Sequence, residues 1–131
     1  KGGQFANKNK FKNCIFDNSR LNTNLRDHFE ECSFVKANLS GAVIGSAFIN
    51  TDFENANLSK IRGNGTIFTN CNFKGVKAKN LEIHRCKFIN CNFIDSYFSN
   101  GSFYGAIFEN CNIDINCFDN MILDNTKGLK S

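Results

Sequence analysis

The sequence predicts an all-β fold in which the chain winds into a solenoid of square cross-section. The first observation is a spacing of five. From Phe48 to Leu123 every fifth residue belongs to one series, and 14 of its 16 members are Phe, Leu or Ile. The second observation is a longer repeat, because similar segments begin at Asn70, Asn90 and Asn110, 20 residues apart. A fixed internal period of this kind is typical of stacked repeat architectures.

A period of five fits neither an α-helix nor an ordinary strand, whose periods are about 3.6 and 2. We call the residues of the series central positions. The residue two before each one is usually small, and the residue two after it is Asn, Asp or Gly in 13 of 16 cases. These three residue types tolerate left-handed backbone, so each unit is expected to form one short side and one corner. Four sides close a square, and the 131 residues allow roughly six coils stacked about 4.8 Å apart.

The N-terminal part of the chain follows this pattern with interruptions. Residues 1–10 are polar and are expected to form a cap or to be frayed. The spacing of five then begins, but it fails between Leu21 and Phe29, so an irregular loop is expected at residues 22–28. A shortened corner or bulge is expected at Gly45, where two successive central positions are only four residues apart.

From Phe48 onward the spacing holds without interruption, although some positions carry unusual residues. The central positions Gly63 and Ala78 are too small to fill the interior, so Ile61 and Val76 in the neighbouring small positions are expected to compensate. Underfilled interiors lose stability, so some compensation of this kind is required.

The last coil is expected to be distorted, because Asn116 and Met121 are large for small positions. Residues 124–131 are the candidate C-terminal cap, with Leu129 folding over the last coil, since an uncapped solenoid exposes unpaired strand edges. The whole chain, residues 1–131, is expected to be a single domain.

Seven cysteines would suggest disulfides in a small secreted protein, but their positions favour another interpretation. All except Cys117 occupy small positions, where a thiol serves as a compact apolar group, and Cys71, Cys91 and Cys111 are expected to form one column. Reduced packing thiols are therefore predicted, with disulfides and metal binding as the alternatives. Cys117 falls one residue before a central position and is expected to be exposed. Reduced thiols are typical of the cytoplasm, and no apolar run is long enough to cross a bilayer.

The repeats resemble those of the pentapeptide-repeat family, whose loose consensus is Ala-(Asp/Asn)-Leu-X-X. The segments at residues 37–41 (Ala-Asn-Leu-Ser-Gly) and 56–60 (Ala-Asn-Leu-Ser-Lys) match it directly. The resemblance covers roughly residues 29–123 and implies a right-handed quadrilateral parallel β-helix, that is, a pentapeptide-repeat solenoid. Residues 81–86 are also similar to a segment of the quinolone-resistance (Qnr) type, whose members resemble B-form DNA and protect DNA gyrase.

Several outward residues are candidates for a binding surface. The side that carries Phe48, Phe68 and Phe88 should present a group of isoleucines, which predicts either a partner surface or simply residues suited to strands. The candidate partner-binding residues are Ile49, Ile67, Lys87, Ile89 and Ile107. The next side should present a ladder of stacked polar side chains, namely Asp52, Asn72, Asn92 and Asn112.

Charged residues give two further patterns. A basic group could meet phosphate or an acidic protein, or could merely keep the surface solvated; it comprises Lys77, Lys79 and Tyr97, with Lys74, Arg85 and Lys87 nearby. The last coil is acidic, but its carboxylates should point to four different sides: Glu109, Asp114, Asp119 and Asp124. They are therefore not expected to form a catalytic pair.

The sequence predicts a protein that is not an enzyme and that needs no cofactor or metal. His28 lies in the expected loop and His84 faces outward, and neither has a nucleophile or a metal-ligand spacing around it. The first functional hypothesis is a protein-interaction scaffold with a partner of unknown identity. The alternative is a DNA mimic that protects a topoisomerase such as gyrase. Two features depart from it: a net charge of +4, and the lack of the C-terminal dimerisation segment that the Qnr type carries, unless residues 22–28 or sequence outside this chain supply an equivalent. Neither a membrane nor direct nucleic-acid binding is expected.

Overall fold

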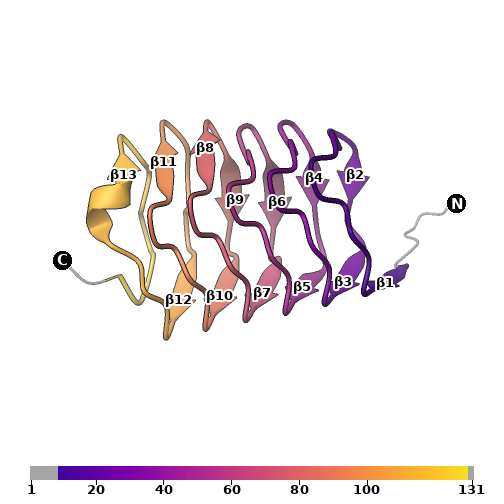
Figure 1. Ribbon diagram of the computed structural model, residues 1–131. Helices are drawn as coiled ribbons and strands as arrows, with labels where there is room; N and C mark the ends of the chain where they lie inside the picture. Colours follow the sequence, from indigo (N-terminus) through magenta and orange to yellow (C-terminus); the bar gives the residue numbers. More distant parts are fainter. Residues whose placement is uncertain (1–8, 130–131) are drawn as a thin grey trace, which may run out of the picture.

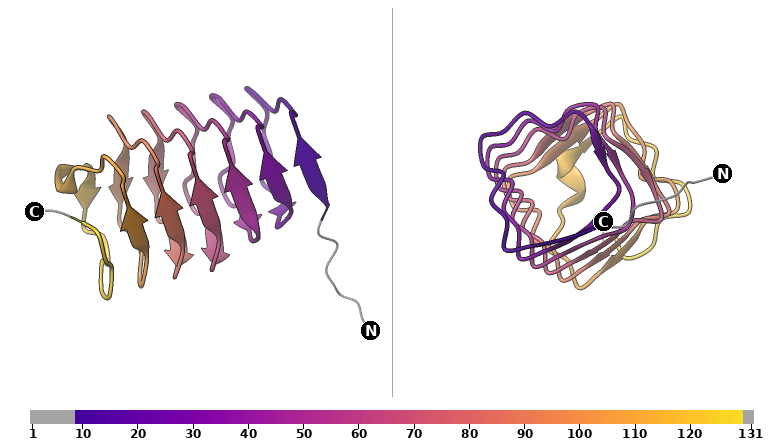
Figure 2. Two further views of the ribbon diagram at one scale, coloured as in Figure 1. Left: turned by 90° about the horizontal axis from the view of Figure 1, so that it is seen from below. Right: turned by 90° about the vertical axis from the view of Figure 1, so that its right-hand side faces the viewer.

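The chain forms a quadrilateral parallel β-helix, described by a computed structural model for residues 9–129. Figure 1 shows the coils stacked into a rod, and the end-on view in Figure 2 shows their four-sided outline. Each coil contributes one short segment to each side of the rod, and hydrogen bonds join it to the coils before and after. The predicted fold class is confirmed.

We number the four sides in chain order. Side 1 is a six-stranded sheet of β1 (Lys10–Lys12), β3 (His28–Glu30), β5 (Ala47–Ile49), β7 (Ile67–Thr69), β10 (Lys87–Ile89) and β12 (Ile107–Glu109). Side 2 is held by isolated parallel bridges that include Asp52, Asn72 and Asn92. Side 3 contains β8 (Lys77–Lys79), β11 (Tyr97–Ser99) and β13 (Phe118–Asp119). Side 4 contains β2 (Asn24–Leu25), β4 (Val43–Ile44), β6 (Arg62–Asn64) and β9 (Glu82–His84).

The interior consists of stacked aromatic rings from the central positions. Phe88 lies between Phe68 and Phe108, with ring centroids 4.8 and 4.9 Å apart and planes within 5° of parallel. Rings on adjacent sides meet edge to face, as Phe88 and Phe93 do at 5.4 Å. This alternation of offset stacks and edge contacts is the arrangement that aromatic quadrupoles favour. The core is therefore one continuous column along the rod.

The corners explain the recurrence of Asn, Asp and Gly two residues after each central position. Their φ angles are positive throughout the rod, for example +53° at Asn70 and +69° at Gly75. This left-handed region is unfavourable in conformational energy for residues other than glycine, and Asn is among the residues that adopt it most readily. Lys60 and Arg85 occupy the same conformation, with φ of +59° and +55°. The five-residue periodicity thus sets the backbone even where the residue type is unfavourable.

The expected irregular loop at residues 22–28 is only partly irregular. It contains strand β2, and Leu25 is a buried central position that pairs with Ile44. Two sides of this coil are simply shorter, so that 18 residues separate the paired Phe11 and Phe29, compared with 20 in later coils. His28 likewise belongs to strand β3 and not to a loop. The shortened corner expected at Gly45 is present, since 19 residues separate the paired Phe29 and Phe48.

The underfilled central positions are compensated partly as expected. Ile61 and Val76 are buried. The preceding coil also helps to fill the interior at Gly63, because a Cβ built on Gly63 would lie 2.6 Å from Cγ1 of Ile44. The Ile44 side chain therefore already occupies the space that a larger residue at position 63 would need.

The last coil is distorted, and the expected exposure of Cys117 is wrong. A 3₁₀-helix (η1, Ile115–Cys117) replaces the regular corner after Ile113, and the Asp114 side chain accepts a hydrogen bond from the backbone N–H of Asn116 at 2.9 Å. This turn moves Asn116 outward and brings Cys117 into the core, where it is 8% exposed. The large, polar Asn116 is thus excluded from the interior and a thiol takes its place.

Only part of the two expected caps lies within the described residues. Residues 1–8 of the N-terminal segment lie outside them, and Lys10 already belongs to β1. At the other end Lys127 pairs with Ile107, and Leu129 packs against the core. The C-terminal residues thus begin a further coil along side 1, and their role as a cap stays a prediction.

Candidate functional site

Side 1 brings together the five residues predicted to bind a partner. The sheet register aligns outward side chains into two columns that run along the rod. The first column contains Lys10, His28, Ala47, Ile67, Lys87 and Ile107, and the second contains Lys12, Glu30, Ile49, Thr69, Ile89 and Glu109. We call the group Ile49, Ile67, Lys87, Ile89 and Ile107 the isoleucine surface.

The isoleucine surface is accessible and lies between charged groups. Ile67 and Ile107 are 43% and 37% exposed, whereas Ile49 and Ile89 are half-buried between their neighbours. Lys87 interrupts the apolar column, and its Nζ lies 3.8 Å from a carboxylate oxygen of Glu109. The isoleucine surface is therefore an apolar strip that one charge pair, Lys87 with Glu109, interrupts.

Toward the N-terminus, side 1 becomes fully polar. The Lys10 Nζ lies 3.2 Å from Glu30, and the hydrogen bond from Lys10 lowers the pKa of the Glu30 carboxyl. The His28 Nε2 lies 3.6 Å from the other carboxylate oxygen of Glu30. Three charged or ionisable groups thus mark the end of the apolar surface.

Side 2 carries the predicted ladder of polar side chains. Asn72 donates from Nδ2 to Asp52, and Asn92 donates to Asn72, each at 3.1 Å. Asn112 ends the ladder by accepting from the backbone N–H of Phe93 at 2.9 Å. A second ladder at the corners was not predicted, although its 20-residue spacing was visible in the sequence; for example, Asn70 donates to Asn50 at 3.1 Å. Both ladders satisfy polar groups along the rod, which is a structural role.

Side 3 carries part of the basic group. Lys77 and Lys79 point outward from β8, and the register places Tyr97 of β11 beside Lys77. The Tyr97 hydroxyl donates to Asp119 at 2.8 Å, and this hydrogen bond raises the pKa of the tyrosine. The other members are dispersed: Lys74 lies on side 2 and Lys87 on side 1, while Arg85 stacks over the ring of Tyr104 at 5.4 Å.

The acidic residues of the last coil point to four sides, as predicted. Asp114 caps η1, Asp119 accepts from Tyr97, and Glu109 faces Lys87. Asp124 follows the last central position of side 4. No pair of these carboxylates is brought together for proton transfer.

The cysteines are free thiols that fill the interior. Cys71, Cys91 and Cys111 form the predicted column, and each donates its thiol to the carbonyl of the phenylalanine 23 residues earlier, at 3.2–3.5 Å. Cys71 and Cys91 are buried, and Cys111 is partly buried. Among the described residues, no group of three His, Cys, Asp or Glu side chains could hold a metal ion.

Burial raises the pKa of the Cys86 thiol from 9.0 to about 12. The folded protein therefore holds this proton more tightly than the unfolded chain does. Its contribution to stability is complete below about pH 9 and is lost as the pH rises toward 12. The unfolding free energy of the wild type is expected to fall between about pH 8 and about pH 10.5, and we expect this fall to be smaller in Cys86→Ala. Urea denaturation at the two pH values measures it. Equal slopes for Cys86→Ala and the wild type would contradict the prediction.

No helix among the described residues is long and apolar enough to cross a bilayer.

Comparison with known proteins identifies the repeat. A family model described as pentapeptide repeats matches eight copies, at residues 46–80 and 83–113. The solved structures similar to this chain include trypsin-treated QnrB1, a plasmid-mediated fluoroquinolone resistance protein, with 17% identity, coverage of 89% of this chain and 80% of that chain, and a TM-score of 0.43. They also include the pentapeptide-repeat protein Rfr23 from the cyanobacterium Cyanothece 51142 (17% identity, 92% and 88% coverage, TM-score 0.32).

A third similar structure is HetL, a pentapeptide-repeat protein involved in heterocyst differentiation regulation in Nostoc sp. strain PCC 7120 (11% identity, 92% and 89% coverage, TM-score 0.26). No curated protein sequence matches this chain.

Proposed function

The chain belongs to the pentapeptide-repeat family, and from that premise we propose that it is a non-enzymatic scaffold that binds a partner protein through the isoleucine surface of side 1. The observation that carries the proposal is the register of side 1, which groups isoleucines from four successive coils on one solvent-facing sheet. β-Branched residues suit strands wherever they lie. Their grouping on adjacent strands of one sheet is the kind of exposed apolar cluster that marks interaction sites.

The distribution of charge favours this proposal over a DNA mimic. A mimic of duplex DNA would need rows of carboxylates that replace the phosphates. Among the described strand positions, no column of paired residues carries acidic side chains in two successive coils. The basic residues Lys77 and Lys79 occupy the middle of side 3 instead. A gyrase supercoiling assay with and without a quinolone tests the alternative, and protection of gyrase by the protein would overturn the scaffold proposal.

All seven cysteines are free thiols, so the scaffold is compatible with a reducing compartment, and we propose the cytoplasm as its location.

The scaffold proposal predicts that Ile67→Asp, Ile89→Asp and Ile107→Asp together abolish partner capture. Three buried carboxylates would oppose association, because each would lose hydration without gaining a partner. The measurement is affinity capture from extracts of the source cells with the immobilised protein, followed by quantitative mass spectrometry. We expect the recovery of the partner to fall at least about tenfold.

A matched control uses three exposed isoleucines that lie on other sides: Ile15→Asp, Ile94→Asp and Ile122→Asp. Their exposures are 77%, 48% and 53%, so both triple variants change surface residues and alter net charge equally. The control is expected to retain the partner. Circular dichroism and thermal unfolding establish that both variants keep the solenoid. If both variants or neither variant loses the partner, the isoleucine surface is not the binding site.

A further inference from the structure

Side 3 carries a compact group of three lysines that we call the lysine patch: Lys60, Lys77 and Lys79. Lys77 and Lys79 lie one residue apart on β8, so their outward side chains are neighbours. Lys60 occupies the corner of the preceding coil, and its backbone N–H donates to the Lys79 carbonyl at 2.9 Å. All three residues are exposed. The patch therefore spans two adjacent coils.

The charge of the lysine patch is not neutralised by neighbouring side chains. Among the described residues, the ion pairs join Lys10, His28 and Lys87 to Glu30 or Glu109, all of them on side 1. The positions next to the patch carry neutral polar groups: Asn57 pairs with Lys77, and the Ser59 hydroxyl accepts from the Lys79 backbone N–H at 3.0 Å. Three like charges in adjacent coils repel one another, and an anionic partner would relieve that repulsion.

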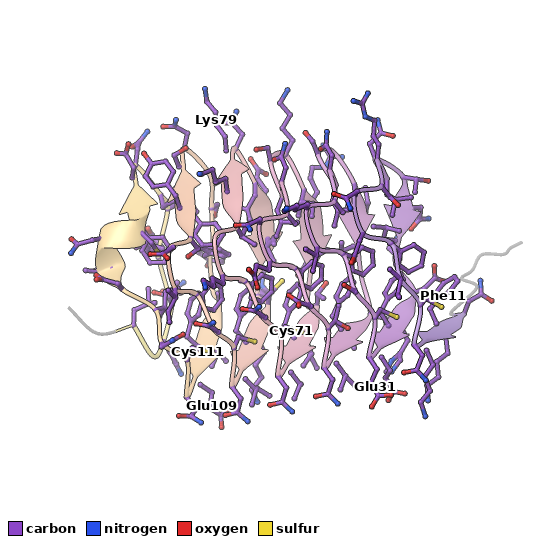
Figure 3. All side chains as sticks on the ribbon, in the orientation of Figure 1. Phe11, Glu31, Cys71, Lys79, Glu109 and Cys111 are labelled. Carbon is purple, nitrogen blue, oxygen red and sulfur yellow. The ribbon has the colours of Figure 1, made fainter. Side chains whose placement is uncertain are left out.

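The lysine patch lies opposite the isoleucine surface. In Figure 1 strands β8 and β11 occupy the upper edge of the rod and β7, β10 and β12 the lower edge. Figure 3 shows Lys79 directed upward and Glu109 downward, away from the axis on opposite sides. A molecule bound at one surface would leave the other free.

We propose that the lysine patch binds a short acidic segment of a protein, independently of the isoleucine surface. Two carboxylates lie near the lysine patch: Glu82 follows on side 4 of the same coil, and Asp119 lies beyond Tyr97 toward the C-terminal end of side 3. A long phosphate backbone that continued along the coil to side 4, or along the rod toward the C-terminus, would meet one of these carboxylates. A short segment with a few Asp or Glu residues can bind the three lysines without reaching them.

The exposed ring of Tyr97 also favours a peptide over a single-stranded nucleic acid. Single strands bind through several aromatic side chains on which successive bases stack. On the described part of side 3, Tyr97 is the one exposed aromatic residue, and its hydroxyl is already held by Asp119. A single ring beside Lys77 suits the apolar part of one peptide side chain. The protein would then bind an acidic segment of one partner at the lysine patch and an apolar surface of another partner at the isoleucine surface.

The test measures the binding of a labelled oligoglutamate peptide by fluorescence anisotropy at low ionic strength. We expect Lys77→Ala with Lys79→Ala to weaken binding about 5- to 30-fold, because two exposed charge pairs are lost. The matched control is Lys10→Ala with Lys12→Ala, which removes two lysines with the same spacing from β1 on side 1. The control is expected to bind within about twofold of the wild type.

Three results would overturn the proposal. These are no binding to the wild type, equal weakening in the control variant, and tighter binding of an oligothymidylate of equal charge through the same lysines. The last result would assign the patch to nucleic acid. The variant with aspartate at positions 67, 89 and 107 separates the two surfaces. It is expected to keep peptide binding, so a failure of the isoleucine surface and a failure of the lysine patch can be told apart.

Discussion

Phe88→Ala is expected to lower the free energy of unfolding by about 3–5 kcal/mol, among the largest effects of any single substitution in this chain. The Phe88 side chain is 2% exposed and stacks on rings from the coils before and after it. It also meets Phe73, Phe93 and Phe103 edge to face. The rod has no second layer that could move in, so the cavity would remain largely open. Since each coil contacts only its neighbours, the loss would also weaken the coupling between the two halves.

Urea denaturation followed by circular dichroism measures this loss, with Phe11→Ala as the matched control. Phe11 is half-buried in the first coil and stacks on Phe29 alone, at 5.1 Å. Its replacement removes the same atoms but a smaller part of the core, and we expect a loss of about 1–2 kcal/mol. Equal losses of unfolding free energy in both variants would mean that the stacked phenylalanine rings of the interior are not the main source of the solenoid's stability.

The fold could be predicted because one local rule repeats along the chain. A large apolar residue every fifth position, a small residue two before it and a turn-forming residue two after it require a short side and a corner each time. The rule also places outward residues on particular sides, which is why the isoleucine surface and the side 2 ladder follow from the sequence. Both inferences use the stacking of successive coils and no other contact between parts of the chain that are distant in the sequence.

The rule fails where a coil departs from five residues per side. Leu25 lies four residues from the central positions before and after it, so the spacing of five passes over it, although it is buried and paired with Ile44. The position of Cys117 depends on η1, a turn stabilised by the Asp114 side chain. In both cases packing in the folded protein, and not the spacing of five, decides which residue is buried.

The lysine patch shows a similar limit for surfaces. Lys77 and Lys79 are recognisable as a basic pair in the sequence, but Lys60 joins them only because the preceding coil brings its corner beside β8. Arg85 and Lys87 are close to the pair in the sequence and are nevertheless turned toward other sides. Proximity along the chain is therefore a poor guide in a solenoid, and the 20-residue register is the better one.

Gly101→Ala is expected to destabilise the protein by about 3–4 kcal/mol, although it adds a single methyl group. Gly101 occupies a small position directly above Leu81, whose carbonyl accepts a hydrogen bond from the Ser102 N–H at 2.9 Å. A Cβ on Gly101 would lie 2.3 Å from that same oxygen and 2.8 Å from the Leu81 nitrogen. The obstacle is backbone, so the coils would have to separate, and a rung of the ladder would be lost.

The control for this prediction is Gly41→Ala, because Gly41 has no atom within 4 Å of an added Cβ but has a φ of +84°. Its replacement costs only the left-handed conformation, about 1–2 kcal/mol. Urea denaturation of the two variants therefore compares steric crowding between coils with backbone strain at a corner. A loss at Gly101 no larger than that at Gly41 would contradict the close approach of the coils at Leu81. In that case the small residues would be needed for the backbone conformation at the corners and not for the close approach of stacked coils.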